Sequence, residues 1–154
     1  MPNLVLVDTS CLIALTNIGE LSLLAKTFDQ PIATTALVAS EFGSELPPFV
    51  RIIDLKDLST FEALKKTLDD GEASLIALAR TMPDSLLVLD DAKARQTASS
   101  YGLSMIGTLG IIVLAKEKSV IAHGAPYLQQ LKTAGFRISS QLEQTVLNAL
   151  GETL

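Results

Sequence analysis

Two short apolar segments, far apart in the chain, each lead directly into carboxylates. Residues 4–7 (LVLV) precede Asp8, and residues 86–89 (LLVL) precede Asp90 and Asp91. A short, continuous apolar run is typical of a strand that is buried on both faces, as strands of parallel sheets are. Because crossovers between parallel strands have one hand, we expect the two sets of carboxylates to meet at the same sheet edge.

Apolar runs of this kind alternate with helical segments along the chain. The expected strands are residues 4–7, 31–34, 49–55, 86–89 and 104–106. Residues 72–82 are apolar on nearly every side, which predicts a central helix. The alternation indicates an α/β fold, in which helices cover both faces of a parallel sheet of about four or five strands. Ligands of such sheets bind at the C-terminal ends of the strands, at the topological switch point.

Length and composition favour one globular domain that spans residues 1–154. The chain is 48% hydrophobic and 19% charged, which is not a disordered composition. Cys11 is the only cysteine, so no internal disulfide forms, and a cytoplasmic location is the default expectation. No apolar stretch approaches the roughly 20 residues needed to cross a bilayer, and we expect no signal peptide.

The net charge of −5 argues against nonspecific attraction to nucleic acid. A local basic rim is still compatible with this charge, because Lys93 and Arg95 follow directly after the Asp90–Asp91 pair. The alternative interpretation of these two residues is a solvated helix face. The late apolar helices carry more aliphatic surface than one sheet of this size needs, which predicts a homodimer.

Each carboxylate of the expected cluster has an ordinary structural explanation when taken alone. Asp8 would cap a helix, Glu72 would complete a capping box with Asp69, and Asp90 or Asp91 would cap the helix that follows. Placed together at one sheet edge, however, they would repel one another, and a divalent cation would relieve that repulsion. Oxygen ligands favour Mg²⁺ or Mn²⁺, and a chain with one cysteine and one histidine does not build a zinc site.

Glu41 is not placed by spacing alone. It lies six residues into its expected helix, roughly 9 Å below the helix start. It reaches the sheet edge only if that helix lies across the edge; otherwise it is a surface glutamate.

Several other sites are not supported by the sequence. It contains no Gly-x-Gly-x-x-Gly or Walker A motif for nucleotide phosphates and no Gly-x-Ser-x-Gly nucleophile elbow. A haloacid-dehalogenase-like phosphatase would need a second aspartate where Ser10 stands. A receiver-type phosphoacceptor domain stays open, since it also gathers acids around Mg²⁺ in a parallel sheet.

The order of motifs resembles that of PIN domains over nearly the whole chain, and in particular a prokaryotic branch related to VapC-type toxins. Glu41 matches the second acid of the family, Glu72 the third and Asp91 the fourth, with Asp90 as the alternative to Asp91. In two places the chain departs from the pattern: many PIN nucleases carry aspartate at the position of Glu72, and Lys118–Ser119 stand where a glycine often ends the helix. The matching segments are residues 7–13 (VDTSCLI), 37–42 (LVASEF), 68–73 (LDDGEA), 87–91 (LVLDD), 107–112 (GTLGII) and 134–139 (AGFRIS).

This resemblance implies a three-layer α/β/α sandwich and Mg²⁺- or Mn²⁺-dependent cleavage of single-stranded RNA. It makes Asp8 the central metal ligand and makes Glu41, Glu72 and Asp91 the residues that complete or orient the shell. Thr9 or Ser10 would hold Asp8 through a hydroxyl, and Lys93 and Arg95 would meet the phosphate backbone.

Three functions compete at this point. The first is an endoribonuclease, as the toxin partner of a small antitoxin protein. The second is a non-catalytic module that keeps the fold and binds a metal or a protein at the acidic edge. The third is the phosphoacceptor domain, which labelling of an aspartate by acetyl phosphate would identify.

Overall fold

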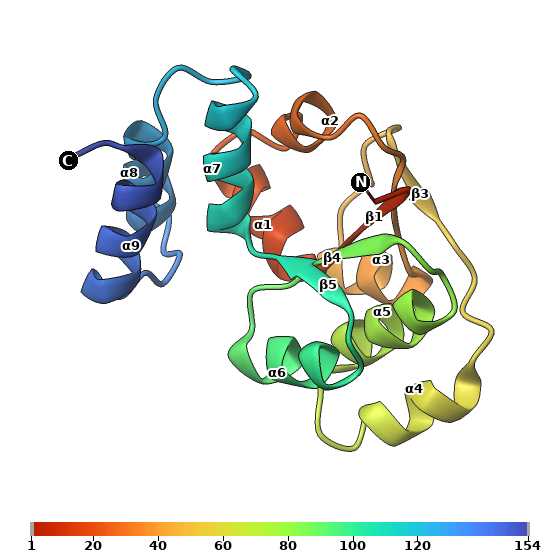
Figure 1. The fold of residues 1–154 in the computed structure, drawn as a ribbon. Helices are drawn as coiled ribbons and strands as arrows, with labels where there is room; N and C mark the ends of the chain where they lie inside the picture. The colour runs from red at the N-terminus through yellow and green to blue at the C-terminus, as the bar shows by residue number, and fades with distance from the viewer. Residues whose placement is uncertain (1, 154) are drawn as a thin grey trace.

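A computed structural model describes residues 2–153 (Figure 1). Met1 and Leu154, which belong to the expected domain, lie outside the described residues. A five-stranded, entirely parallel sheet with the order β3-β2-β1-β4-β5 forms the centre, so the expected α/β fold is confirmed. The strands are β1 (Leu4–Val7), β2 (Ile32–Thr34), β3 (Val50–Ile52), β4 (Ser85–Val88) and β5 (Ser104–Ile106).

Helices connect the strands and extend the chain beyond the last one. Residues 2–153 contain α1 (Thr9–Asn17), α2 (Leu23–Thr27), α3 (Ala36–Phe42), α4 (Leu58–Leu64), α5 (Asp70–Arg80), α6 (Ala92–Ser100), α7 (Thr108–Glu117), α8 (Ala125–Thr133) and α9 (Ser140–Leu150). Among these described residues, no helix is both long enough and apolar enough to span a membrane.

Side-chain alternation along β1 creates the two faces of the sheet. Leu4 and Leu6 pack in one cluster with residues of α4, α5 and α6. Val5 and Val7 pack in a second cluster with residues of α1, α2, α3 and α7. Because successive side chains of a strand point to opposite faces, one fully apolar strand supplies both cores and makes the three layers.

The sheet order places the switch point beside Asp8. From β1 the chain passes outward to β2 and β3, and it then returns to the other side of β1 to form β4 and β5. The C-terminal ends of β1 and β4 therefore lie side by side where the direction of winding reverses, and this is the position at which such sheets bind ligands. Asp8 follows one of these ends, and Asp90 lies two residues beyond the other.

The structure shortens the third expected strand. Pairing was expected over residues 49–55, but β3 ends at Ile52. Its neighbour β2 ends at Thr34, which pairs with Ile52 and accepts one more hydrogen bond from the backbone N–H of Ile53 (2.9 Å). The strand stops there because no partner backbone continues beside it.

Side-chain caps set the starts of two further helices. Asp57 caps α4 and accepts hydrogen bonds from the backbone and the hydroxyl of Thr60. Ser139 caps α9 and accepts a hydrogen bond from the backbone N–H of Leu142.

The last two helices lie away from the sheet: α9 packs on α7, and α8 packs on α9 and α1 (Figure 1). Their apolar residues join those of α7 in a third cluster. Of the large apolar side chains that are exposed in residues 2–153, Leu142 (43% exposed) is the one that belongs to α8 or α9. The late helices thus use most of their apolar surface inside the chain, and the homodimer stays a prediction that light scattering tests.

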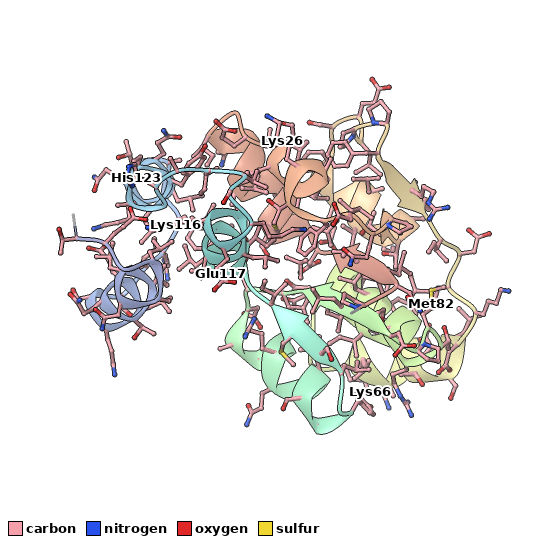
Figure 2. The ribbon with its side chains drawn as sticks, turned by 45° about the horizontal axis from the view of Figure 1, so that its top comes forward. Lys26, Lys66, Met82, Lys116, Glu117 and His123 are labelled. Carbon is pink, nitrogen blue, oxygen red and sulfur yellow. The ribbon has the colours of Figure 1, made fainter. Side chains whose placement is uncertain are left out.

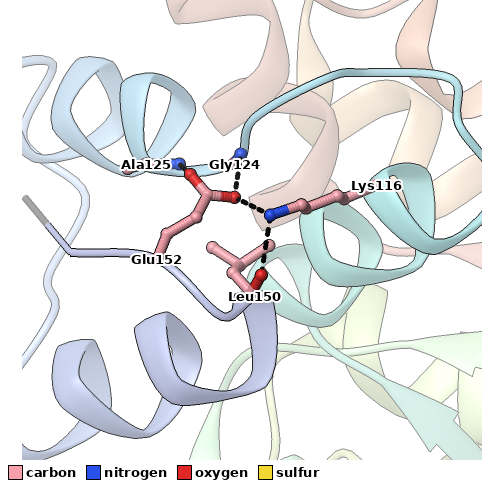
Figure 3. A network of polar contacts seen from close by, with 5 residues as sticks. All are labelled: Lys116, Gly124, Ala125, Leu150 and Glu152. Carbon is pink, nitrogen blue, oxygen red and sulfur yellow. Dashed lines mark hydrogen bonds and ion pairs between the residues drawn. The ribbon is translucent and has the colours of Figure 1, made fainter.

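A polar network fastens the C-terminal segment to the start of α8 (Figure 3). The Glu152 carboxylate accepts hydrogen bonds from the backbone N–H groups of Gly124 (2.9 Å) and Ala125 (3.0 Å) and pairs with Lys116 (2.6 Å). Lys116 also donates to the carbonyl of Leu150, at the end of α9 (2.7 Å). His123 is exposed just before α8 (Figure 2).

Candidate active site

Asp8 lies at the junction of β1 and α1 and is 3% exposed. Its backbone N–H donates to the carbonyl of Val88 (3.2 Å), which ties the end of β1 to the end of β4. Asp8 occupies the N-cap position of α1, yet its side chain makes no capping hydrogen bond. Its Oδ1 has no hydrogen-bond partner within residues 2–153. A buried, unpaired carboxylate oxygen calls for an explanation other than a cap, such as a bound ligand.

The surroundings of Asp8 favour its protonated form. The pKa of Asp8 rises to about 6, mainly because burial removes water from the carboxylate. The backbone N–H of Thr9 opposes this rise, whereas the negative charges of Glu41, Asp90 and Asp69 add to it. Asp8 thus lies within the field of several other carboxylates, which is the electrostatic situation that a divalent cation relieves.

Glu41 reaches this edge from the last turn of α3. Its Oε2 accepts a hydrogen bond from the hydroxyl of Thr9 (3.0 Å), and its Oε1 accepts one from the backbone N–H of Gly71 (2.7 Å). The carboxylate thereby joins the start of α1 to the start of α5. Spacing alone did not place Glu41 at the sheet edge. In the structure its carboxylate contacts Thr9, the residue after Asp8, and its charge acts on Asp8.

Glu72 is half-buried in the first turn of α5. Burial raises the pKa of Glu72 to about 7, and the charges of Asp8, Asp91 and Asp69 raise it further. Its Oε1 accepts a long hydrogen bond from the backbone N–H of Asp69 (3.4 Å), as the capping-box spacing predicted. Glu72 therefore serves the helix start and also lies in the field of the other acids.

Asp90 and Asp91 have different surroundings. Asp90 accepts hydrogen bonds from the backbone N–H of Thr108 (2.8 Å) at Oδ1, and from the hydroxyls of Thr108 (2.6 Å) and Ser10 (3.3 Å) at Oδ2. Asp91 caps α6 by accepting from the backbone N–H of Ala94 (2.9 Å). The charge of Asp90 acts on Asp8 and that of Asp91 acts on Glu72, so the two aspartates extend the cluster in two directions.

The family model of the PIN domain DUF3368 matches residues 4–152. The chain belongs to this PIN domain family. PIN domains are typically nucleases and commonly use divalent metals. No curated protein and no solved structure matches the chain.

Two hydroxyls of this PIN domain do not act as expected. Thr9 and Ser10 were expected to hold Asp8, but their hydroxyls donate to Glu41 and Asp90 instead. All three residues are consecutive at the start of α1, and side chains one or two positions apart on a helix do not face each other. The two hydroxyls therefore hold Glu41 and Asp90 rather than Asp8.

The two expected RNA-binding cations also differ from each other. Lys93 is exposed in the first turn of α6. Arg95 is half-buried, and its Nη1 donates to the carbonyl of Leu89 at the end of β4 (2.8 Å). Arg95 is thus partly engaged by the backbone that leads into Asp90.

The carboxylates have the right donor atoms for a hard cation, but they are not arranged as a complete coordination shell. Within residues 2–153, no three acidic, histidine or cysteine side chains lie close enough together to hold a metal ion as they stand. All the acids offer oxygen and Asp8 keeps an unpaired Oδ1. Burial, and after it the charges of the neighbouring acids, raises the pKa of both Asp8 and Glu72. Oxygen donors of this kind could hold a hard cation such as Mg²⁺ or Mn²⁺.

Two residues that hold the acids in place had no predicted role. Thr108 is fully buried and gives Asp90 two hydrogen bonds, and Gly71 gives Glu41 one. Both belong to segments that carried the family resemblance. The available signal was their position at helix starts, where free backbone N–H groups can hold a carboxylate.

Proposed function

We propose that this protein is a metal-dependent endoribonuclease that cleaves single-stranded RNA at the acidic edge of its sheet. The observation that carries the proposal is the Asp8 carboxylate, which is buried among other acids with one oxygen unpaired. A helix cap has no need of that arrangement, because a cap uses its oxygen on a backbone N–H. Membership of a family whose members are typically nucleases supports the same conclusion.

The surroundings of each residue indicate its role in the proposed reaction. Asp8 would be the central ligand of Mg²⁺ or Mn²⁺, with Glu41, Glu72 and Asp91 completing or orienting the shell. When bound, the ion would lower the pKa of a water and stabilise charge on the leaving oxygen. Thr9, Gly71 and Thr108 would fix the carboxylates through the hydrogen bonds described above. Lys93 and Arg95 would meet the phosphate backbone of the RNA.

The biological role that goes with this activity is that of a toxin neutralised by a small antitoxin protein. The motif order shared with VapC-type toxins supports this role. Expression of the protein in bacteria should then arrest growth, and expression of the Asp8→Asn variant should not. If both arrest growth equally, or neither does while RNA is cleaved in vitro, the toxin role is wrong and the nuclease activity stands.

The direct test is cleavage of labelled single-stranded RNA. We expect cleavage with Mg²⁺ or Mn²⁺, none in EDTA, and none by the Asp8→Asn variant prepared in parallel to control for contaminating nucleases. Absence of cleavage by the wild type with either metal would favour the alternative, a non-catalytic module that binds a metal or a protein.

A further inference from the structure

A cavity of about 650 Å³ opens beside the candidate active site. Asp90, Asp91, Phe136 and Arg137 are among the residues that line it. Apolar residues of β5, of the start of α7 and of α9 line the rest. Its volume lies within the range of about 300–1,000 Å³ that is usual for small-ligand pockets. The cavity thus extends from the acids to the loop between α8 and α9. The proposed cleavage mechanism gives this loop no role.

Phe136 is held in place before any ligand arrives. It follows Gly135, whose φ of 99° is a backbone conformation that glycine adopts readily. The backbone N–H of Phe136 donates to the carbonyl of Leu131 (2.9 Å), and its side chain packs partly against the C-terminal apolar cluster. An aromatic ring fixed in this way at a cavity wall offers a flat apolar surface at little cost in conformational entropy.

Arg137 supplies positive charge next to the ring. It is exposed, and none of the ion pairs formed within residues 2–153 involves it. Arg95 also lines the cavity. The lining of the cavity therefore combines apolar side chains, two guanidinium groups and two carboxylates. This combination complements a nucleotide, which has a flat base and an anionic phosphate.

The overall charge makes the contribution of the ring important. With a net charge of −5, the protein gains little from general attraction to a polyanion. Binding of RNA must then come from a few local contacts, and stacking of a base on an aromatic ring is sequence-tolerant because every base has a π-face.

We propose that this cavity binds the nucleotide next to the cleaved phosphodiester, with its base stacked on Phe136 and its phosphate held by Arg137. The proposal rests on the proposed function, since it concerns the RNA that enters the acidic edge. It identifies the α8–α9 loop as a substrate-binding segment. It also predicts that RNA binds mainly through stacking, with few phosphate contacts.

The first experiment measures binding of a short, fluorescently labelled single-stranded RNA in EDTA, where the RNA stays intact. Phe136→Ala should raise Kd by about tenfold, the size expected for the loss of one base–aromatic stack. Phe136→Leu keeps an apolar side chain but not the ring and should bind as weakly, whereas Phe136→Tyr should bind like the wild type. Equal binding by all four proteins would overturn the proposal, provided their melting temperatures agree.

Salt dependence separates the ring from the guanidinium. For single strands, log K falls with log salt with a slope of about −0.7 for each phosphate contact. Arg137→Gln should therefore make the slope shallower by about 0.7, and Arg137→Lys should keep it. Phe136→Ala should weaken binding without changing the slope. Because Arg137 is exposed, its substitution leaves folding intact; an unchanged slope for Arg137→Gln would remove Arg137 from the proposal.

A spectroscopic reporter observes the stack directly. The chain contains no tryptophan, so Phe136→Trp introduces a single fluorophore into the cavity wall. Titration with the RNA should quench its emission, because a stacked base is in contact with the indole. Tyr101→Trp is the matched control, since Tyr101 is exposed at the end of α6 and does not line the cavity. Quenching of both variants alike, or of neither, would contradict stacking at Phe136.

The outcomes distinguish this inference from the proposed function. If the wild type cleaves RNA and both Phe136→Ala and Phe136→Leu bind it as tightly as the wild type, the cavity is not the nucleotide site and the proposed nuclease activity stands. If RNA binding depends on Phe136 but no metal condition gives cleavage, the proposed nuclease activity is wrong and the cavity stands as an RNA-binding site. If the wild type binds no RNA and Phe136→Ala instead changes the mass measured by light scattering, the cavity is a protein interface and the inference is wrong.

Discussion

The carboxylate of Glu41 lies directly against the backbone of Gly71. The backbone N–H of Gly71 donates to Oε1 of Glu41 (2.7 Å), and a Cβ at position 71 would lie 2.6 Å from Oε2. Real Cβ atoms do not approach other atoms so closely, so any larger residue at position 71 must displace the carboxylate. The absence of a side chain at Gly71 therefore sets the position of an acid on a different helix.

Gly71→Ala should reduce RNA cleavage by at least about tenfold while leaving stability within about 1 kcal/mol of wild type. Alanine is favoured over glycine in helices by about 1 kcal/mol, which offsets the crowding at a flexible side-chain end. Cleavage falls because Glu41 is displaced from its place beside Asp8. Cleavage rates and melting temperatures of the two proteins test this.

A double-mutant cycle identifies the route of the effect. If Gly71→Ala acts through Glu41, it should have little further effect in a Glu41→Ala background. Full additivity of the two changes would mean that Gly71 influences cleavage by another path.

The position of Asp8 and the Asp90–Asp91 pair at one edge followed from the sequence, because it depends on strand ends alone. Apolar runs located β1 and β4, and parallel pairing fixed which ends lie together. The position of Glu41 did not follow from spacing, because it depends on how α3 packs against α1 and α5. Tertiary contacts set that packing, and the family resemblance supplied what the local pattern lacked.

Hydrogen-bond partners were the least predictable part of the site. Thr9 and Ser10 turn to Glu41 and Asp90 because the helix start directs their hydroxyls away from Asp8. Thr108 reaches Asp90 across 18 positions of the chain, and no local periodicity encodes that contact. Strand and helix patterns predict which backbone ends meet, whereas side-chain rotamers at those ends depend on neighbours from several elements.

Asp91→Asn should abolish most cleavage without changing the melting temperature. Asparagine caps a helix about as well as aspartate, so the hydrogen bond from Ala94 is kept. Asp91→Ala should also lose the cap, at a cost of about 1 kcal/mol. Parallel cleavage and thermal-unfolding measurements on both variants decide the role.

Asp90→Asn is the variant with which the stability and cleavage of the Asp91 variants are compared. The carboxylate of Asp90 accepts three hydrogen bonds, and an amide can accept at only one of its two atoms, so this variant should lose about 1–3 kcal/mol of stability. Full cleavage by Asp91→Asn would show that Asp91 only caps α6 and would leave Asp90 as the fourth acid.

Glu152→Gln should lower the melting temperature at neutral pH by roughly 3 °C. Lys116, and then the backbone N–H groups of Gly124 and Ala125, lower the pKa of Glu152 from 4.5 to about 2 (Figure 3). A lowered carboxyl pKa contributes stability above its ordinary value, and that contribution is lost as the pH falls from about 4.5 to about 2. The difference between wild type and variant should therefore shrink over this range.

Glu143→Gln is the matched control for this measurement. Glu143 pairs with Lys132 at 2.6 Å, the same distance as the Glu152–Lys116 pair, and no backbone N–H donates to its carboxylate within residues 2–153. Glu143→Gln should thus have the smaller effect. Equal effects of the two substitutions would show that the backbone hydrogen bonds of Glu152 add nothing.

Asp8→Asn should reduce cleavage by orders of magnitude and leave stability in EDTA equal or higher. The loss of cleavage follows from the loss of the central ligand. The gain in stability follows from the raised pKa of Asp8, about 6 in the folded protein against an ordinary 3.8. The unfolded chain releases this proton at lower pH than the folded one, so the Asp8 carboxyl destabilises the fold progressively as the pH rises from about 3.8 through about 6.

The measurement is therefore a pH series of melting temperatures in EDTA, combined with Mn²⁺-dependent cleavage at neutral pH. Wild type should lose stability relative to Asp8→Asn between about pH 4 and pH 6 and stay below it at higher pH. Added Mn²⁺ should raise the melting temperature of the wild type more than that of the variant, because only the wild type keeps the full set of ligands. A helix cap predicts no such difference, since asparagine replaces aspartate in a cap with little change in stability at any pH. Cleavage by the variant at the wild-type rate, together with parallel melting curves across the series, would show that Asp8 caps α1 and that the active-site assignment is wrong.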